Sequence, residues 1–172
     1  MTVYLTSFKR WHQPNPNDDI AGPDIAIGRA YSIAVYQPDW FPQLPKLNLF
    51  DIRDENKQWV RPRNFMPAFE FASGDLDTDV GNPNAPNQEL LKRYHDTLVG
   101  IYEERWHRGD NTDILLREQD TALCCWCPYD KAAQRQLEDY GSFVCHSWPV
   151  ETFLKGLGVE VVRDADRGRM VT

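Results

Sequence analysis

Hydrophobic and polar residues follow patterns along the chain that predict both strands and helices. The run TVYLTSF at 2–8 is rich in β-branched and aromatic residues and ends at a basic, polar stretch, which predicts a strand. We expect a second strand to begin within DIAIGRA at 24–30, after a loop of turn-forming residues. Prolines recur too often from 36 to 87 for long regular elements, so this range is predicted to be a loop-rich insertion. Within it, FDIRD at 50–54 has the composition of a short strand.

The longest helix is predicted over 87–108, with Asn87 as its N-cap and Gly109 as its stop. One face of this helix is apolar, because its large apolar residues recur every three or four positions. They are Leu90, Leu91, Tyr94, Leu98, Ile101, Tyr102 and Trp106. We interpret the two histidines of this helix, His95 and His107, as surface or boundary residues.

Strands and helices alternate in the C-terminal half of the chain. The compact apolar run TALCCWC at 121–127 is suited to a buried strand. An exposed, added helix is predicted at 129–141, a core helix with Pro149 in its first turn at 147–158, and a final strand at 159–164. This alternation favours an α/β class with a largely parallel sheet.

The length of 172 residues favours a single domain spanning 1–172, which we predict to be a three-layer Rossmann-like domain. A net charge of -7 with no basic stripe argues against duplex nucleic acid as a partner. No apolar run approaches the length of about 18 residues that predicts a membrane helix, and the N-terminus lacks the pattern of a signal peptide. We therefore expect a cytoplasmic protein that does not enter membranes. The oligomeric state is left open.

All four cysteines of the chain lie between residues 121 and 147. Because strand side chains alternate between faces, Cys125 and Cys127 are expected on one face and Cys124 on the other. Cys145 and His146 directly precede a predicted helix, whose N-terminus favours an anion and lowers the pKa of a thiol. Cys145 is therefore the better candidate nucleophile.

Two other interpretations of the cysteines remain open. A structural metal such as zinc could be held by Cys125, Cys127, Cys145 and His146, or could use the C-x-x-C pair Cys124 and Cys127, although neither set has the usual zinc-finger spacing. Cys124 could instead be a small buried hydrophobic residue. No phosphate-binding glycine loop, nucleophile elbow or H-E-x-x-H motif is present.

The order of short motifs resembles a family of bacterial and phage proteins catalogued as domain of unknown function 488. The motifs run VYLTSF, IAIGRA followed by PDWF, ELLKRYHDTLVGIYEERW, TALCCW, FVCH and VEVV, and together they touch most of the chain. The resemblance implies the α/β fold and a set of candidate positions. It implies no reaction, because the family has no settled activity.

Carried over by resemblance, the strand cysteine of the family falls on Cys125 and its Cys-His pair on Cys145 and His146. The arginine of the second strand falls on Arg29, and the Thr-Ser pair falls on Thr6 and Ser7. The sequence departs from the family pattern in two places. Ser147 replaces the arginine expected after His146, and the segment between Cys125 and Cys145 is longer than in the family. These departures put in doubt whether the substrate specificity of the family carries over to this chain.

The leading hypothesis is a thiol-dependent enzyme acting on a small polar or nucleotide-like substrate. Cys145 is its nucleophile or redox thiol, His146 its base and Cys125 a second thiol, while Arg29 binds an anionic group. Thr6 or Ser7 is expected at the rim of the same pocket, where the ends of parallel strands meet. The alternatives are a non-enzymatic binding module with a Cys/His metal clip and a phage protein that binds a host partner.

Overall fold

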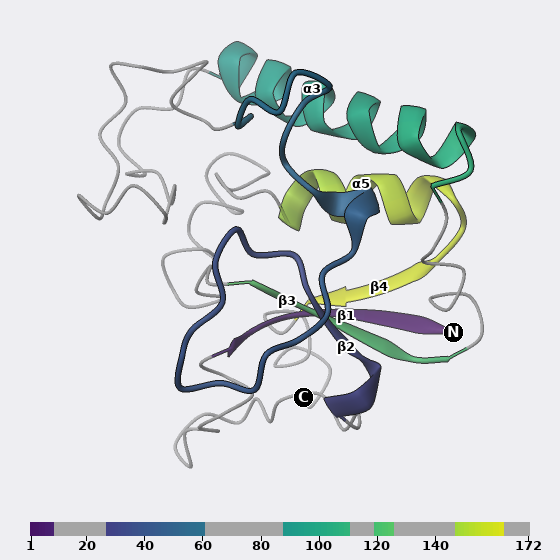
Figure 1. Cartoon of the computed structure of the whole chain (residues 1–172). Helices are drawn as coiled ribbons and strands as arrows, with labels where there is room; N and C mark the ends of the chain where they lie inside the picture. The colour runs from purple at the N-terminus through teal and green to yellow at the C-terminus, as the bar shows by residue number, and fades with distance from the viewer. Residues whose placement is uncertain (9–26, 61–87, 111–118, 126–146, 164–172) are drawn as a thin grey trace.

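The computed structural model describes residues 1–8, 27–60, 88–110, 119–125 and 147–163 (Figure 1). Its centre is a four-stranded sheet in the order β2-β3-β1-β4, in which every neighbouring pair is parallel. The strands are β1 (Thr2–Ser7), β2 (Ala30–Ser32), β3 (Thr121–Cys125) and β4 (Glu160–Arg163). The predicted fold class is confirmed: the chain forms a small α/β, Rossmann-like domain.

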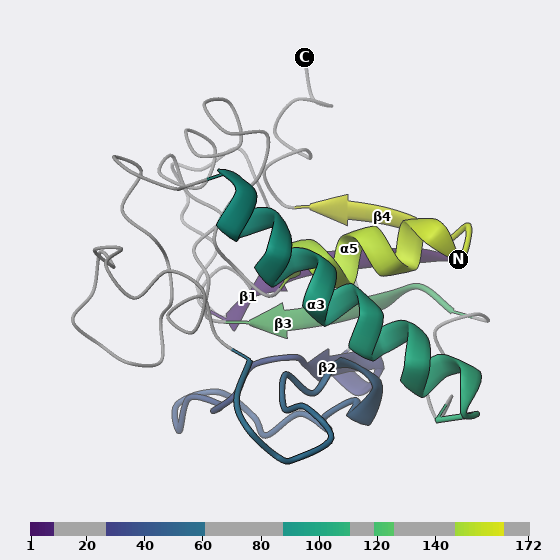
Figure 2. The ribbon, with the colours of Figure 1, turned by 90° about the horizontal axis from the view of Figure 1, so that it is seen from above.

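Two helices lie on one face of the sheet (Figure 1). They are α3 (Gln88–His107) and α5 (Ser147–Gly156), and α3 crosses over α5 when the domain is seen from above (Figure 2). Gly109 has a φ of 84° just beyond α3, in the left-handed region that favours glycine, so it ends the helix as predicted. Each predicted core helix therefore forms close to its predicted bounds.

The main core fills the space between the sheet and these helices. Alternate strand residues point into it, where they meet the apolar stripe of α3 and the inner face of α5. Its members include Val3, Leu5, Leu123, Tyr94, Leu98, Tyr102, Val150, Phe153 and Leu154. A smaller cluster covers the opposite face of the sheet and includes Phe8, Ala30, Phe41, Leu44, Ala122 and Cys124. Both faces of the sheet are thus packed, as expected for a parallel sheet.

The described part of the loop-rich segment is fixed by backbone hydrogen bonds and by one arginine of α3. The Ser32 N–H donates to the Pro45 carbonyl at 2.9 Å, which extends the sheet edge beside β2. The Arg105 guanidinium donates to the carbonyls of Asn48 (3.3 Å) and Leu49 (3.1 Å), and also to those of Asp51 and Arg53. Desolvation lowers the pKa of Arg105 from its ordinary value.

One local prediction in this segment is corrected. FDIRD at 50–54 is not a strand: Asn48–Phe50 forms a 3-10 helix, η2, and Arg53 makes an isolated antiparallel bridge with Trp59. The second strand begins at Ala30, within the predicted range 24–30 and directly after a 3-10 helix, η1 (Ile27–Arg29). Its place is set by pairing with β3, since Ala30 lies opposite Ala122. The predicted added helix at 129–141 lies outside the described residues.

Candidate functional site

The carboxyl ends of the two central strands bring four of the polar and sulfur-bearing residues together. In the parallel pairing of β1 with β3, Thr6 lies opposite Cys124 and Ser7 lies opposite Cys125. All four residues are buried. Three of the predicted site residues, Thr6, Ser7 and Cys125, are therefore neighbours at one edge of the sheet.

This edge contains the topological switch point of the sheet. From β1 the chain continues to β2 on one side of the β1–β3 pair, whereas from β3 it continues to β4 on the other side. Connections that leave adjacent parallel strands toward opposite edges open a crevice beyond the carboxyl ends of those strands, and ligands of open α/β sheets bind there. In this chain that position lies beyond Ser7 and Cys125.

The two described cysteines face opposite sides of the sheet, as the strand pattern predicts. Cys125 belongs to the core under the helices, whereas Cys124 packs with Phe8 and Phe41 on the other face. Both side chains have 0% exposure. Their thiols therefore contribute to packing, as small hydrophobic residues do.

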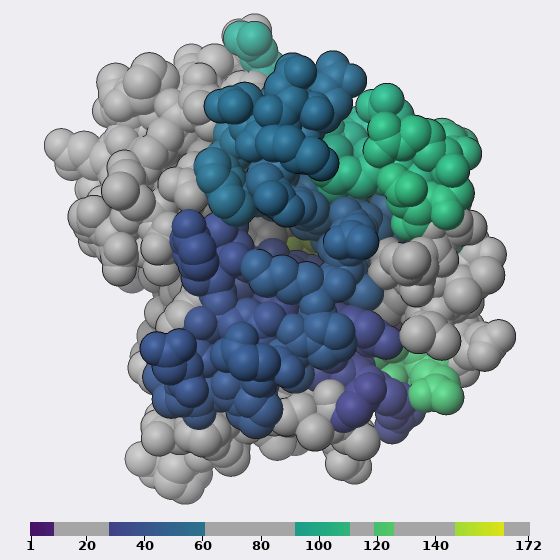
Figure 3. All heavy atoms as spheres, viewed as in Figure 1, coloured from purple at the N-terminus to yellow at the C-terminus, as the bar shows by residue number. Residues whose placement is uncertain are grey.

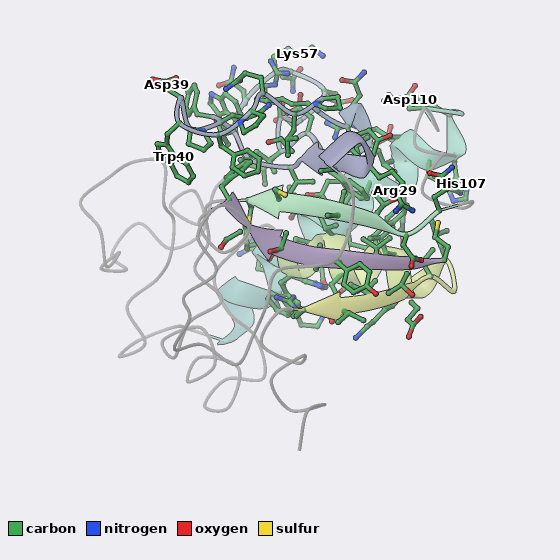
Figure 4. All side chains as sticks on the ribbon, turned by 90° about the horizontal axis from the view of Figure 1, so that it is seen from below. Arg29, Asp39, Trp40, Lys57, His107 and Asp110 are labelled. Atoms are coloured by element: carbon green, nitrogen blue, oxygen red, sulfur yellow. The ribbon has the colours of Figure 1, made fainter. Side chains whose placement is uncertain are left out.

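Arg29 does not join the other predicted site residues. It precedes β2, and the first residue of β2, Ala30, lies opposite Ala122 near the start of β3. Figure 4 shows Arg29 at the end of the sheet where the strands begin. The sequence predicted Arg29 in the same pocket as Ser7, where the parallel strands end. The structure instead places Arg29 at the opposite end of the sheet from Ser7 and Cys125.

The remaining predicted site residues, Cys127, Cys145 and His146, lie outside the described residues. The first described residue after them is Ser147, which is fully buried at the start of α5. The N-terminus of α5 lies at the side of the sheet where β1 and β3 end (Figure 2). The dipole of the helix therefore favours negative charge at this end of the sheet.

His95 is a buried polar residue at the contact between α3 and α5, with an exposure of 7%, so its assignment to the surface or boundary was wrong. Its Nε2 lies 2.7 Å from Thr152 Oγ1, and its Nδ1 lies 3.0 Å from Asp96 Oδ1. Its ring lies against Trp148 with 4.0 Å between centroids. The hydrogen bond from Lys92, and then that from His95, lowers the pKa of Asp96.

A signal for the burial of His95 exists in the sequence. His95 follows Leu91 by four residues and precedes Leu98 by three, so it lies on the same stripe of the helix as those apolar residues. The signal was outweighed by the usual preference of a polar ring for the surface.

Within the described residues, no group of three or more histidine, cysteine or acidic side chains is arranged to hold a metal ion. Three of the four residues in the alternative zinc set lie outside that part of the chain. In the same described ranges, no helix is both long and apolar enough to cross a membrane.

Comparisons with known proteins find only distant similarity. No protein-family model matches the chain, and no solved structure matches it. Among curated proteins, it is similar to the guanine nucleotide-binding protein G(s) subunit alpha of Homarus americanus, with 24% identity over 145 residues, 81% of this chain and 37% of that protein. The same subunit of Drosophila pseudoobscura pseudoobscura is 24% identical over 131 residues, 74% of this chain and 33% of that protein. The chain thus spans about a third of the length of these relatives.

Proposed function

We propose that this protein is a thiol-dependent enzyme that acts on a small polar, nucleotide-like substrate at the switch-point crevice. The observation that carries the proposal is the register of the central strands, in which Ser7 and Cys125 end side by side at the switch point. The start of α5 at the same edge of the sheet supports it, because a helix N-terminus stabilises both anionic ligands and thiolates (Figure 2).

In this proposal Cys145 is the nucleophile or redox thiol and His146 is its base. Both directly precede Ser147, the first residue of α5. Ser7, with an exposure of 3%, would contact the substrate at the rim of this site, whereas Thr6 is fully buried beside it. Cys125 takes the part of a buried neighbour, because its side chain has 0% exposure. Arg29 has no part in the proposal, since it lies at the other edge of the sheet.

The nucleotide-like character of the substrate has one outside support: the similar curated proteins are named as guanine nucleotide-binding. The sequence contains no G-x-x-x-x-G-K-[ST] loop to hold phosphates. In this proposal the phosphate group would instead lie at the N-terminus of α5, where backbone N–H groups favour anions.

The test is alkylation of the native protein by iodoacetamide over a range of pH, followed by mass spectrometry of each cysteine. Cys145 should react faster than Cys124, with an apparent pKa below the ordinary value of about 8.5. GMP and GTP, added separately, should slow the alkylation of Cys145. Equal rates for all four thiols would refute the thiol enzyme.

Two measurements separate this function from its alternatives. The Cys127→Ser variant is the matched control, because it removes a different thiol of the chain and should leave the alkylation rate of Cys145 unchanged. Metal analysis of the purified, reduced protein should find no stoichiometric zinc. One zinc per chain, released by Cys145→Ser, would instead establish the metal clip.

A further inference from the structure

A pocket lies between the end of β2 and the segment that follows it. Its volume is about 90 Å³, and its walls come from residues 32–35, 46–48, 50–53 and 59. Figure 3 shows a hollow in this face of the domain, bordered by the blue atoms of the segment 27–60. The pocket therefore lies beyond the carboxyl end of an edge strand.

The size of the pocket limits what can enter it. A water molecule has a share of about 30 Å³ in the liquid, and a cavity of about 150 Å³ accommodates benzene. A pocket of about 90 Å³ is therefore too small to enclose an aromatic ring. It is large enough for a compact headgroup such as a carboxylate or a phosphate.

Three of the lining side chains carry hydrogen-bond donors that the described part of the protein leaves unused. The Lys46 ammonium donates to the Val35 carbonyl at 2.5 Å and has two further N–H groups. The Arg53 guanidinium binds Asp51 through Nε and Nη2, and its Nη1 has no partner among the described residues. In the same described ranges, the side-chain amide of Asn48 makes no hydrogen bond.

The described lining residues carry a net positive charge although the whole chain carries a net charge of -7. Among these described residues Asp51 contributes the one carboxylate, and this group is neutralised by its ion pair with Arg53. Burial alone would raise the pKa of Asp51, but the hydrogen bonds and charge of Arg53 outweigh burial and lower it. Lys46 makes no ion pair with any described carboxylate, so its charge is available to a ligand.

The walls are held in place before any ligand binds. Arg105 donates to the carbonyls of Asn48, Leu49, Asp51 and Arg53, which fixes one wall to α3. The Arg53 guanidinium lies 5.5 Å from the centroid of the Trp59 ring, which supports it from the side. A preformed site loses little conformational entropy when its ligand binds.

We propose that this pocket binds the anionic headgroup, carboxylate or phosphate, of a small molecule. Lys46 supplies the counter-charge, and Arg53 Nη1 and the Asn48 amide donate hydrogen bonds. The exposed ring of Trp59, which lines the pocket, offers stacking surface to the body of the molecule outside the pocket. This inference does not rest on the proposed function, because the described lining of the pocket contains neither a cysteine nor a residue of β1 or β3.

The test is an NMR titration of the full chain with acetate, inorganic phosphate and acetamide at constant ionic strength. Acetamide has nearly the shape of acetate but no charge, so it should cause no saturable shifts. At least one of the two anions should shift the backbone amides of 46–53 with weak, millimolar affinity. Acetate and phosphate as separate arms show which headgroup the pocket prefers.

Matched lysine variants complete the experiment. Lys46→Met keeps the aliphatic stem and should weaken anion binding about tenfold, as expected for the loss of a charge-assisted hydrogen bond. Lys57→Asn removes one positive charge from the same segment but outside the lining, and asparagine tolerates the φ of 62° found there. This variant should bind as the unchanged protein does. The proposal is wrong if neither anion binds, if acetamide binds as well as acetate, or if Lys46→Met and Lys57→Asn behave alike.

Discussion

His95 joins the two helices through the polar contacts of its buried imidazole. It bonds Thr152 of α5 on one side and Asp96 of its own helix on the other, and Trp148 covers its ring. A buried polar group is stabilising only while its partners remain in place, because an unsatisfied group retains its full desolvation cost. The residue therefore makes the α3–α5 contact sensitive to substitution.

Replacing His95 by alanine should lower the free energy of unfolding by about 2–3 kcal/mol, because two hydrogen bonds and the ring contact are lost together. The measurement is urea denaturation followed by tryptophan fluorescence and circular dichroism. His107→Ala is the matched control on the same helix, since His107 is exposed, and it should change stability by less than about 0.5 kcal/mol. Equal effects of the two variants would show that the contacts of His95 contribute nothing.

At the scale of single residues, the sequence predicted which face of the sheet a strand residue occupies better than it predicted where a strand begins and ends. The opposite faces of Cys124 and Cys125 follow from the period of two in any strand and are confirmed. The position of Arg29 depends on where β2 starts, and β2 has only three residues. Because β2 starts at Ala30, Arg29 lies just before the strand. It is therefore at the end of the sheet opposite to the one that the sequence predicted.

At the scale of elements, α3 has two structural roles, of which its apolar stripe predicts only the first. Its inner residues form the core with α5, and Arg105 in its last turns fixes the backbone of 48–53. Helices and the buried strand were predictable because their periodicity is local in the sequence. The segment from 36 to 60 was not, because its order depends on contacts with residues more than fifty positions away, such as those of Arg105.

Replacing Arg105 by methionine tests whether α3 holds that segment. The variant keeps the aliphatic packing but leaves four carbonyls without their donor, so unfolding should become easier by about 2–3 kcal/mol. Hydrogen exchange of the amides of 50–53 should also accelerate.

Arg108→Met is the control for this experiment, because Arg108 is exposed and pairs only with Asp110 at the surface. A surface pair of this kind contributes less than about 1 kcal/mol. If Arg105→Met and Arg108→Met lower stability equally, the carbonyl contacts of Arg105 do not order the segment.

At the scale of the whole molecule, the parallel sheet followed from the alternation of strands and helices, whereas the strand order did not. The order β2-β3-β1-β4 places the first strand in the interior of the sheet, between strands that come more than a hundred residues later. Strand pairings this distant in sequence leave no local pattern of residues. The position of the site was predicted only from the general rule that ligands of parallel sheets bind beyond the carboxyl ends of the strands. The register of Ser7 with Cys125 is therefore information that the structure adds.

The central position of β3 leads to a prediction about the cooperativity of the whole domain. Cys124 and Cys125 are fully buried on opposite faces of a strand that is paired on both sides, so a reagent reaches either thiol only when the sheet opens. In the native protein both should react with a disulfide reagent at least about a thousandfold more slowly than in urea, as global stabilities of about 5 kcal/mol or more require. Mass spectrometry of each cysteine against time measures the two rates, and the two thiols should be modified together because one opening event exposes both faces. If Cys124 reacts long before Cys125, the face covered by Phe8 and Phe41 opens on its own, and the domain does not unfold as one unit.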